Sequence, residues 1–192
     1  MMEKQLREHL MKDEQLLWTG RPESFEVLDK TNKSGIIIGS IIKILITLGI
    51  LAFYIISNLE KGSIMPGIVV FILAFGIFSL INPFLVARRM LKKTIYGLTD
   101  KRILRSGANN EAVPYERIKS AVLRTDKDGH TSLLCGPRAV NLKPKKWRSE
   151  ADASFIDSRD NPEAERVILY ALPIDNKLKE LLKKNIPVLT MK

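Results

Sequence analysis

Residues 35–87 form the most apolar stretch of this 192-residue chain, and they limit what it can fold into. The stretch contains two hydrophobic runs, 36–56 and 64–86, separated by the polar segment 57–63. A helix of about 20 residues, rising about 1.5 Å per residue, crosses a hydrocarbon core of roughly 30 Å. Both runs reach that length, and Pro66 suits the first turn of the second helix. We therefore predict a tight transmembrane helical hairpin; the alternative is a very apolar helical pair in a soluble core.

Basic residues flank this hairpin unevenly, in a chain of formal net charge +10. The turn carries only Lys61, whereas Lys30 and Lys33 precede the first run and four basic residues follow the second. Lys and Arg accumulate on the cytoplasmic side of membrane proteins, so we expect both termini in the cytoplasm. Residues 1–33 contain no continuous apolar core, which argues against a cleavable signal peptide. The expected parts are a cytoplasmic N-terminal segment (1–34), the hairpin (35–87) and a cytoplasmic domain (88–192).

One side of the first run carries residues suited to close helix packing. Gly35, Gly39, Lys43 and Thr47 recur every four residues, which stacks them on one side of a helix. The two glycines let another backbone approach closely, so these four residues are candidates for a helix-packing face. Lys43 either extends toward the headgroups or meets a carbonyl, an anionic lipid head or a partner helix.

The rest of the chain has the pattern of an α+β domain with mainly antiparallel strands. An amphipathic helix is expected within 2–17, on the surface of the domain rather than on the membrane, followed by a short strand around Trp18. Segment 141–152 is polar and is expected to be irregular. Helices are expected over 161–172 and after Asp175, which can cap the second one. The expected strands lie at 95–99, 102–105, 112–124, 131–135 and 153–157, and the Asp-Gly segment 126–129 is expected to reverse the chain between the third and the fourth.

Two phrases flank the hairpin, LLWTGRP at 16–22 and YGLTDKRIL at 96–104. Together with YERIKS at 115–120, DGHTSL at 128–133 and FIDSRDNP at 155–162, they resemble the bacterial pleckstrin-homology-like (bPH) membrane proteins. The resemblance implies a split, strongly bent antiparallel sheet or partial barrel, capped by a C-terminal helix, in a protein of the bacterial inner membrane. His130 replaces the second glycine of the family's turn, and the basic piece 138–148 is longer than the family's pattern.

Residues that could carry catalysis or hold a metal are sparse. The chain has one cysteine, Cys135, and two isolated histidines, His9 and His130, without metal-ligand spacing. It has neither a nucleophile–base set nor a Gly-rich phosphate loop followed by Lys-Ser/Thr. We therefore expect no catalytic residue, no metal and no cofactor. An enzyme would regain support if His130 and a carboxylate lined one enclosed pocket.

The positive chemical feature is a set of basic residues near the hairpin and in the domain. Clusters beside a transmembrane helix bind anionic headgroups at about 1 kcal/mol per basic residue. The alternative is that the cluster after the second helix only fixes the topology of the hairpin. Segment 143–148 is either a solvated loop or a site where Trp147 docks at headgroup level. The candidate lipid- or partner-binding residues are Arg88, Arg89, Lys92, Lys93, Lys101, Arg102, Arg105, Lys145, Lys146, Trp147 and Arg148.

The favoured function is a non-enzymatic interaction module at the inner leaflet, in envelope maintenance or stress response. Its expected partners are anionic membrane lipids, another membrane protein or a second copy of itself. A self-assembling or accessory subunit of a membrane complex or transporter is the alternative. Nucleic acid is not expected as a partner, because a tethered domain that faces an anionic leaflet accounts for the same charge.

Overall fold

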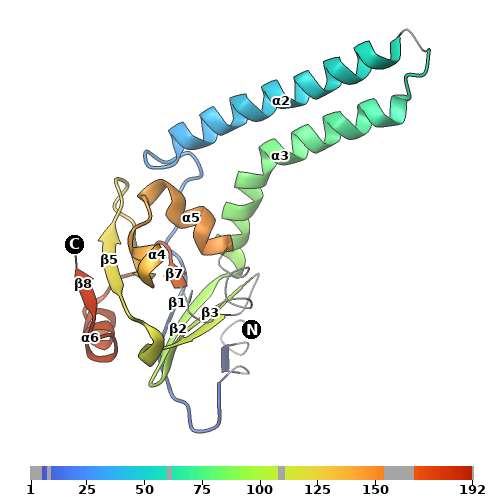
Figure 1. The fold of residues 1–192 in the computed structure, drawn as a ribbon. Helices are drawn as coiled ribbons and strands as arrows, with labels where there is room; N and C mark the ends of the chain where they lie inside the picture. Colours follow the sequence, from blue (N-terminus) through green and yellow to red (C-terminus); the bar gives the residue numbers. More distant parts are fainter. Residues whose placement is uncertain (1–5, 8–9, 60–61, 108–110, 154–166, 192) are drawn as a thin grey trace.

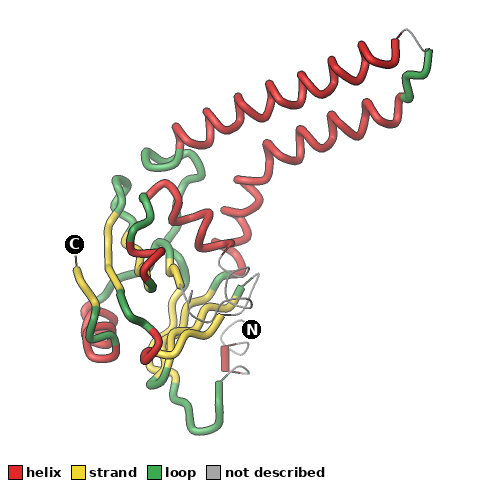
Figure 2. The backbone as a smooth tube through the Cα atoms, in the orientation of Figure 1, coloured by secondary structure: helices red, strands yellow, loops and turns green. Residues whose placement is uncertain are grey.

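A long helical hairpin projects from an α+β body in the computed structural model of the protein (Figures 1 and 2). The structure describes residues 6–7, 10–59, 62–107, 111–153 and 167–191. The body lies at the end of the hairpin where the first long helix begins and the second one ends. We call this end the base of the hairpin.

The hairpin consists of α2 (Lys33–Leu59) and α3 (Pro66–Lys93), both long and apolar enough to span a membrane. Pro66 occupies the first turn of α3, as predicted. No residue of α2 is buried, and large apolar side chains such as Phe53 and Phe71 are exposed on the two helices. The alternative of a helical pair buried in a soluble core is therefore wrong in this structure.

Helix α3 continues past the end of its predicted apolar run, through the basic cluster to Lys93. Ala87 and Met90 explain this continuation, because both are buried in the core of the body. The cluster that we expected just after the helix therefore lies on its last two turns. The helix also contains Pro83 and bends between its hairpin portion and its last turns (Figure 1), as a proline inside a helix causes.

The first sheet joins the two flanks of the hairpin in the antiparallel order β1-β2-β3-β4. Strand β1 (Leu16–Gly20) precedes the hairpin, whereas β2 (Ile95–Thr99), β3 (Arg102–Ser106) and β4 (Glu111–Pro114) follow it. Trp18 pairs with Leu98 in this register. The N-terminal segment therefore contributes a strand to the same folded body as the chain after α3.

The second sheet has the order β7-β6-β5-β8. Strands β5 (Ala121–Thr125) and β6 (Thr131–Cys135) form a hairpin around the predicted turn at 126–129, and a short 3-10 helix, η1 (Tyr115–Arg117), leads into β5. Strand β7 (Val167–Leu169) pairs antiparallel with β6. Strand β8 (Leu189–Met191) pairs parallel with β5 and was not predicted.

Two sequence predictions in the C-terminal half are wrong. Segment 141–152 is mostly helical, because α4 (Pro137–Val140) is followed by α5 (Pro144–Ala153). The helix expected over 161–172 does not extend to Leu172: its described part contains β7, whose three residues are buried and pair with β6. The strand expected at 153–157 begins inside α5 and otherwise lies outside the described residues, as does 161–166.

Helix α6 (Asn176–Asn185) forms as predicted. The Asp175 side chain caps it by accepting a hydrogen bond from the Leu178 N–H at 2.6 Å. Leu178 and Leu182 pack in a core cluster formed by residues of both sheets. A second cluster contains Phe25 together with residues of α3, α5 and the second sheet. At the N-terminal end, Leu6 is buried against Ile95 and Leu104, which places this part of the amphipathic segment on the folded body.

Candidate functional site

An open cavity of about 400 Å³ lies at the base of the hairpin, between the start of α2, the last part of α3 and helix α5. We call it the basal groove. Four of its lining residues are basic, and none is an aspartate or a glutamate. The lining residues are Asn32, Gly35, Ile36, Gly39, Lys43, Asn82, Pro83, Val86, Lys145, Lys146, Arg148 and Ser149.

Helix α5 supplies the basic rim of this groove. It begins at Pro144, a residue that suits the first turn of a helix. Trp147 points inward: its side chain is fully buried, and its Nε1–H donates to the Leu142 carbonyl at 3.0 Å. Lys145 and Lys146 are exposed. The solvated loop and the headgroup docking of Trp147 are both wrong, because Trp147 anchors α5 in the core.

Arg148 connects α5 to the segment that precedes α2. Its guanidinium forms a buried ion pair with Asp29 and donates to the carbonyls of Val27 at 3.0 Å and Glu26 at 3.1 Å. It also lies 4.4 Å from the ring centroid of Phe25, within cation–π distance. Its Nε, however, is buried without a hydrogen-bond partner in the described part of the chain. Arg148 is therefore chiefly a structural residue that also lines the groove.

The start of α2 is held by two carboxylates. Asp29 accepts hydrogen bonds from the backbone N–H and side-chain amide of Asn32, at 2.7 and 2.8 Å. Asp128, in the turn between β5 and β6, accepts from the N–H groups of Lys30 and Thr31 at 2.9 Å and from the Thr31 hydroxyl at 2.5 Å. The bond from the Thr31 side chain lowers the pKa of Asp128. These contacts fix where α2 leaves the body.

Behind Arg148 lies a small polar cluster in which the Tyr170 hydroxyl sits 3.4 Å from both Arg148 Nη2 and Asp126 Oδ2. Burial raises the pKa of Tyr170 to about 12, so the phenol stays protonated at neutral pH. The His130 ring is 6.3 Å from the ring centroids of Phe25 and Tyr170, and its backbone N–H donates to Asp126. His130 does not line the basal groove.

Lys43 lies at the inner end of the groove, and its ammonium donates to the Ser79 carbonyl on α3 at 2.9 Å. In a regular helix this carbonyl would accept from the N–H of residue 83, but Pro83 has no N–H. Lys43 therefore satisfies a carbonyl that the proline frees. Of the two alternatives for Lys43, the structure shows contact with a carbonyl and not extension toward the headgroups.

The four candidate packing residues of α2 have different surroundings. Thr47 packs against α3: a Cβ added to Gly76 would lie 2.7 Å from the Thr47 methyl group. Thr47 also donates to the Lys43 carbonyl at 2.8 Å. A Cβ added to Gly35 or Gly39, by contrast, would meet no atom within 4 Å. The glycine pair therefore leaves open space along the groove and makes no close contact with α3.

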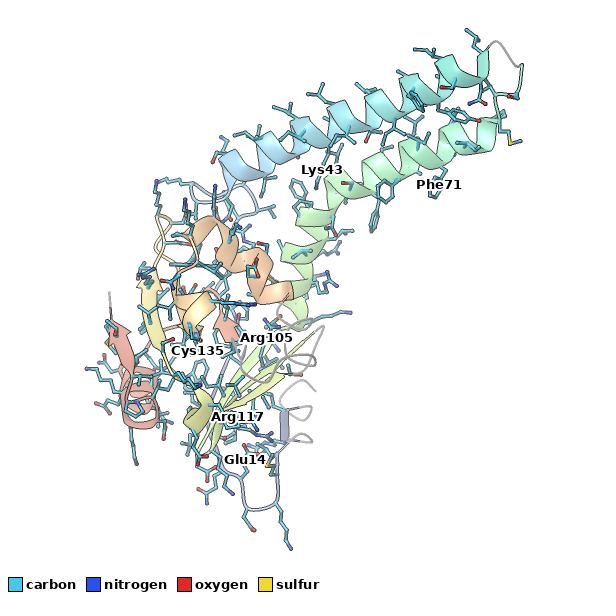
Figure 3. All side chains as sticks on the ribbon, in the orientation of Figure 1. Glu14, Lys43, Phe71, Arg105, Arg117 and Cys135 are labelled. Carbon is cyan, nitrogen blue, oxygen red and sulfur yellow. The ribbon has the colours of Figure 1, made fainter. Side chains whose placement is uncertain are left out.

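The structure separates the predicted basic residues into distinct groups. Arg88, Arg89, Lys92 and Lys93 are exposed on the last turns of α3 and do not line the groove. Lys101 is exposed in the turn between β2 and β3, and Arg102 follows it. Because β2 starts directly after α3 and leads away from it, this turn lies far from the hairpin (Figures 1 and 3). Arg105 is 6% exposed in β3. A single basic surface that contains all of these residues does not exist.

Arg102 pairs with Glu14, which the sequence analysis did not single out. The two side chains are 11% and 0% exposed, and Arg102 Nη2 lies 2.8 Å from Glu14 Oε2. Burial alone would raise the pKa of Glu14, but hydrogen bonds from Arg102, the Met11 N–H and Thr99 outweigh it and hold the pKa at about 2. This ion pair joins the N-terminal segment to the first sheet, so Arg102 has a structural role.

The groove combines cationic side chains with apolar surface, a lining that suits an anionic ligand. Its cations face neither a thiol nor a histidine among the lining residues. Burial raises the pKa of Cys135 to about 12, so this thiol is not a nucleophile at neutral pH. Within the described ranges, no three His, Cys, Asp or Glu residues are grouped so that they could hold a metal ion.

Sequence reasoning missed several residues that shape the groove, notably Asp29, Asn32, Asn82, Pro83 and Ser149. Of these residues, only Pro83 could have been recognised from the sequence, because a proline inside an apolar helical run frees a carbonyl four residues earlier.

A scan against protein-family models finds no match, and searches of curated proteins and of solved structures find none either.

Proposed function

We propose that the chain is an integral protein of the bacterial inner membrane, with two transmembrane helices and both termini in the cytoplasm. Its cytoplasmic body is a PH-like, non-enzymatic interaction module that engages the anionic inner leaflet, in envelope maintenance or stress response. The membrane-length hairpin and the Lys and Arg residues on its flanks support this topology. The two sheets and the C-terminal helix α6 are compatible with the PH-like part.

The observation that carries the proposal is the uninterrupted passage of α3 from the apolar hairpin into the core of the body. Ala87 and Met90 are 1% and 2% exposed, so the end of this helix is held firmly by the body. Exposed basic side chains lie between these two residues, at Arg88 and Arg89, and just after them, at Lys92 and Lys93. A rigid helix thus holds four cations at the level where the apolar segment ends, where each contributes about 1 kcal/mol of attraction to an anionic leaflet.

Because the hairpin tethers the body to the membrane, a weak attraction to the lipid headgroups is sufficient for the body to engage them. A domain that is covalently held at the membrane does not have to find it, so its local concentration at the headgroups is high. The same geometry turns one face of the body toward the bilayer, because α3 enters the core without a flexible linker.

The second candidate function is binding of a helix from another membrane protein or from a second copy of this chain. It is favoured by an apolar cavity of about 340 Å³ at mid-height of the hairpin, lined by residues of both helices. Crosslinking of the full chain in native membranes, followed by identification of the adduct, distinguishes this candidate from lipid binding. A reproducible protein adduct through α2 or α3 supports it, and monomer alone at native expression level contradicts it.

The lipid proposal is tested by extracting the full chain with its surrounding bilayer in polymer discs and quantifying the lipids. We expect the ratio of anionic to zwitterionic lipid to be at least twofold higher for the wild type than for a variant that lacks the four cations of α3. The matched control removes four exposed lysines of α6, which lie far from the hairpin, and should keep the wild-type ratio. The variants are R88Q/R89Q/K92Q/K93Q and K177Q/K179Q/K183Q/K184Q.

Protease accessibility of a C-terminal tag checks that each variant keeps its topology. Equal lipid ratios for all three proteins, with topology unchanged, would contradict the proposed function.

A further inference from the structure

We propose that the basal groove is the binding site for one anionic phospholipid, whose phosphate lies against Lys145 and Lys146 while the start of one acyl chain follows Gly35 and Gly39. This inference rests on the proposed placement of the hairpin in a bilayer. It goes further, because it assigns a discrete site and a ligand class to residues that do not belong to the basic cluster at the end of α3.

Charge selects the class of ligand. Lys43, Lys145, Lys146 and Arg148 line the groove without any carboxylate among the lining residues. Arg148 is neutralised by Asp29, which leaves three positive charges uncompensated within the lining. Lys43 has three N–H donors and gives one to the Ser79 carbonyl. An anionic group with several acceptor oxygens, such as a phosphodiester, complements this arrangement.

Shape selects a lipid rather than a soluble anion. The Gly35 and Gly39 positions have open space where a Cβ would lie, so a strip of α2 backbone forms one wall of the groove. Ile36, Pro83 and Val86 add apolar surface beside it. The cavity of about 400 Å³ holds a headgroup and the beginning of one chain, and it is open, so the rest of the lipid stays outside. A free phosphate would leave the apolar wall unused.

A buried donor gives an independent indication of a missing partner. Arg148 lines the groove and is 6% exposed, and its Nε has no hydrogen-bond partner among the described residues. Buried donors in folded proteins nearly always have a partner, so an acceptor near this side chain would remove an unfavourable burial. Because the Nε atom itself is not exposed in the groove, a phosphate held by the lysines would reach it only through a bridging water molecule.

The site is tested by native mass spectrometry of the delipidated full chain. Equal amounts of phosphatidylglycerol and phosphatidylcholine with the same acyl chains are added in detergent. We expect one phosphatidylglycerol to remain bound, with at least tenfold preference over phosphatidylcholine. K145Q/K146Q should reduce this retention at least fivefold, and both side chains are exposed, so the fold is preserved. The matched control K177Q/K179Q on α6 should retain the lipid as the wild type does.

A second variant blocks the groove without changing its charge. Gly39→Leu places a side chain in the open strip, whereas Gly49→Leu makes the same change on the same helix, also into open space but outside the groove. We expect Gly39→Leu to lose the bound lipid and Gly49→Leu to keep it. Retention by Gly39→Leu equal to the wild type, equal retention of both lipids by the wild type, or displacement by an equal concentration of inorganic phosphate would each overturn the assignment.

The two proposals fail separately. If R88Q/R89Q/K92Q/K93Q keeps the single bound lipid but the polymer discs show no enrichment, the groove stands and the proposed leaflet interaction fails. If enrichment persists in the discs while the groove variants bind lipid like the wild type, the groove assignment fails and the leaflet interaction stands.

Discussion

Replacing Lys43 tests whether this partly buried lysine is present because of Pro83. The Lys43 ammonium donates to the carbonyl that Pro83 leaves without its helical donor, Ser79 O, at 2.9 Å. In Pro83→Ala the restored N–H of residue 83 takes this carbonyl, and the lysine loses its role. The loss caused by Lys43→Met should therefore be smaller, or reversed, when residue 83 is alanine.

The magnitude follows from a double-mutant cycle. Lys43→Met removes a charge from the membrane, where a charge costs roughly 3 kcal/mol at a helix centre. This gain is the same with proline or alanine at position 83, so it cancels in the cycle. What remains is the hydrogen bond to the Ser79 carbonyl. Interhelical hydrogen bonds in membrane proteins contribute about 0.6 kcal/mol and at most about 1.7 kcal/mol, whereas an unsatisfied buried acceptor costs about 1–3 kcal/mol. We expect a coupling free energy of about 1–2 kcal/mol.

The assay is reversible unfolding of the full chain in mixed micelles of dodecyl maltoside and increasing dodecyl sulfate. Wild type, Lys43→Met, Pro83→Ala and the double variant give the cycle. The control cycle pairs Lys43→Met with Pro66→Ala, because Pro66 occupies the first helical turn and frees no helical carbonyl. A coupling below about 0.3 kcal/mol, within the usual error of additivity, would refute the link between Lys43 and Pro83.

Two further predictions concern contacts that the sequence did not reveal. Glu14→Gln should destabilise the protein at pH 7 by about 2 kcal/mol after allowance for solvent screening, since the folded pKa of Glu14, about 2, lies below the ordinary 4.5. The carboxylate stabilises the fold fully above pH 4.5 and less as the pH falls toward 2. In urea unfolding from pH 7 to 3, the free energies of unfolding of wild type and variant should therefore converge, and a constant difference between them would contradict the ion pair. Gly76→Ala should destabilise the hairpin by about 1–3 kcal/mol in dodecyl sulfate unfolding, because its Cβ would lie 2.7 Å from the Thr47 methyl, while Gly49→Ala, which meets open space, should not; equal effects would contradict the close Thr47–Gly76 contact.

The elements that sequence reasoning predicted correctly are those whose signal is local. The apolar runs predicted α2 and α3, the Asp-Gly turn at 126–129 predicted the β5–β6 hairpin, and Asp175 predicted the start of α6. Each signal depends on neighbouring residues alone: length, turn chemistry or a cap. The errors concern segments whose state is decided by distant partners. The short run Val167–Leu169 suits a helix or a strand, and pairing with β6 makes it a strand.

The candidate site was predictable only in part, for the same reason. The sequence pointed to Lys43, Lys145 and Lys146, but it could not show that they lie together. Lys43 belongs to α2, before α3 in the sequence, whereas Lys145 and Lys146 belong to α5, well after α3. It grouped Lys101 and Arg102 with them by charge, although β2 separates these two residues from the hairpin. It also treated Arg148 as a surface cation, since its partner Asp29 is distant in sequence.

Two independent attachments hold the body against the hairpin, and together they fix the geometry of the basal groove. One is the continuation of α3 into the core through Ala87 and Met90. The other is the segment before α2, held by Asp128 on one side and by the Asp29–Arg148 pair on the other. A single attachment would leave the body free to swing about the helix end. With both in place, α5 cannot move away from α2, so Lys145 and Lys146 stay beside the glycine strip even without a ligand. A preorganised groove of this kind binds its ligand without a large ordering cost, which is why one added lipid is expected to stay bound in native mass spectrometry.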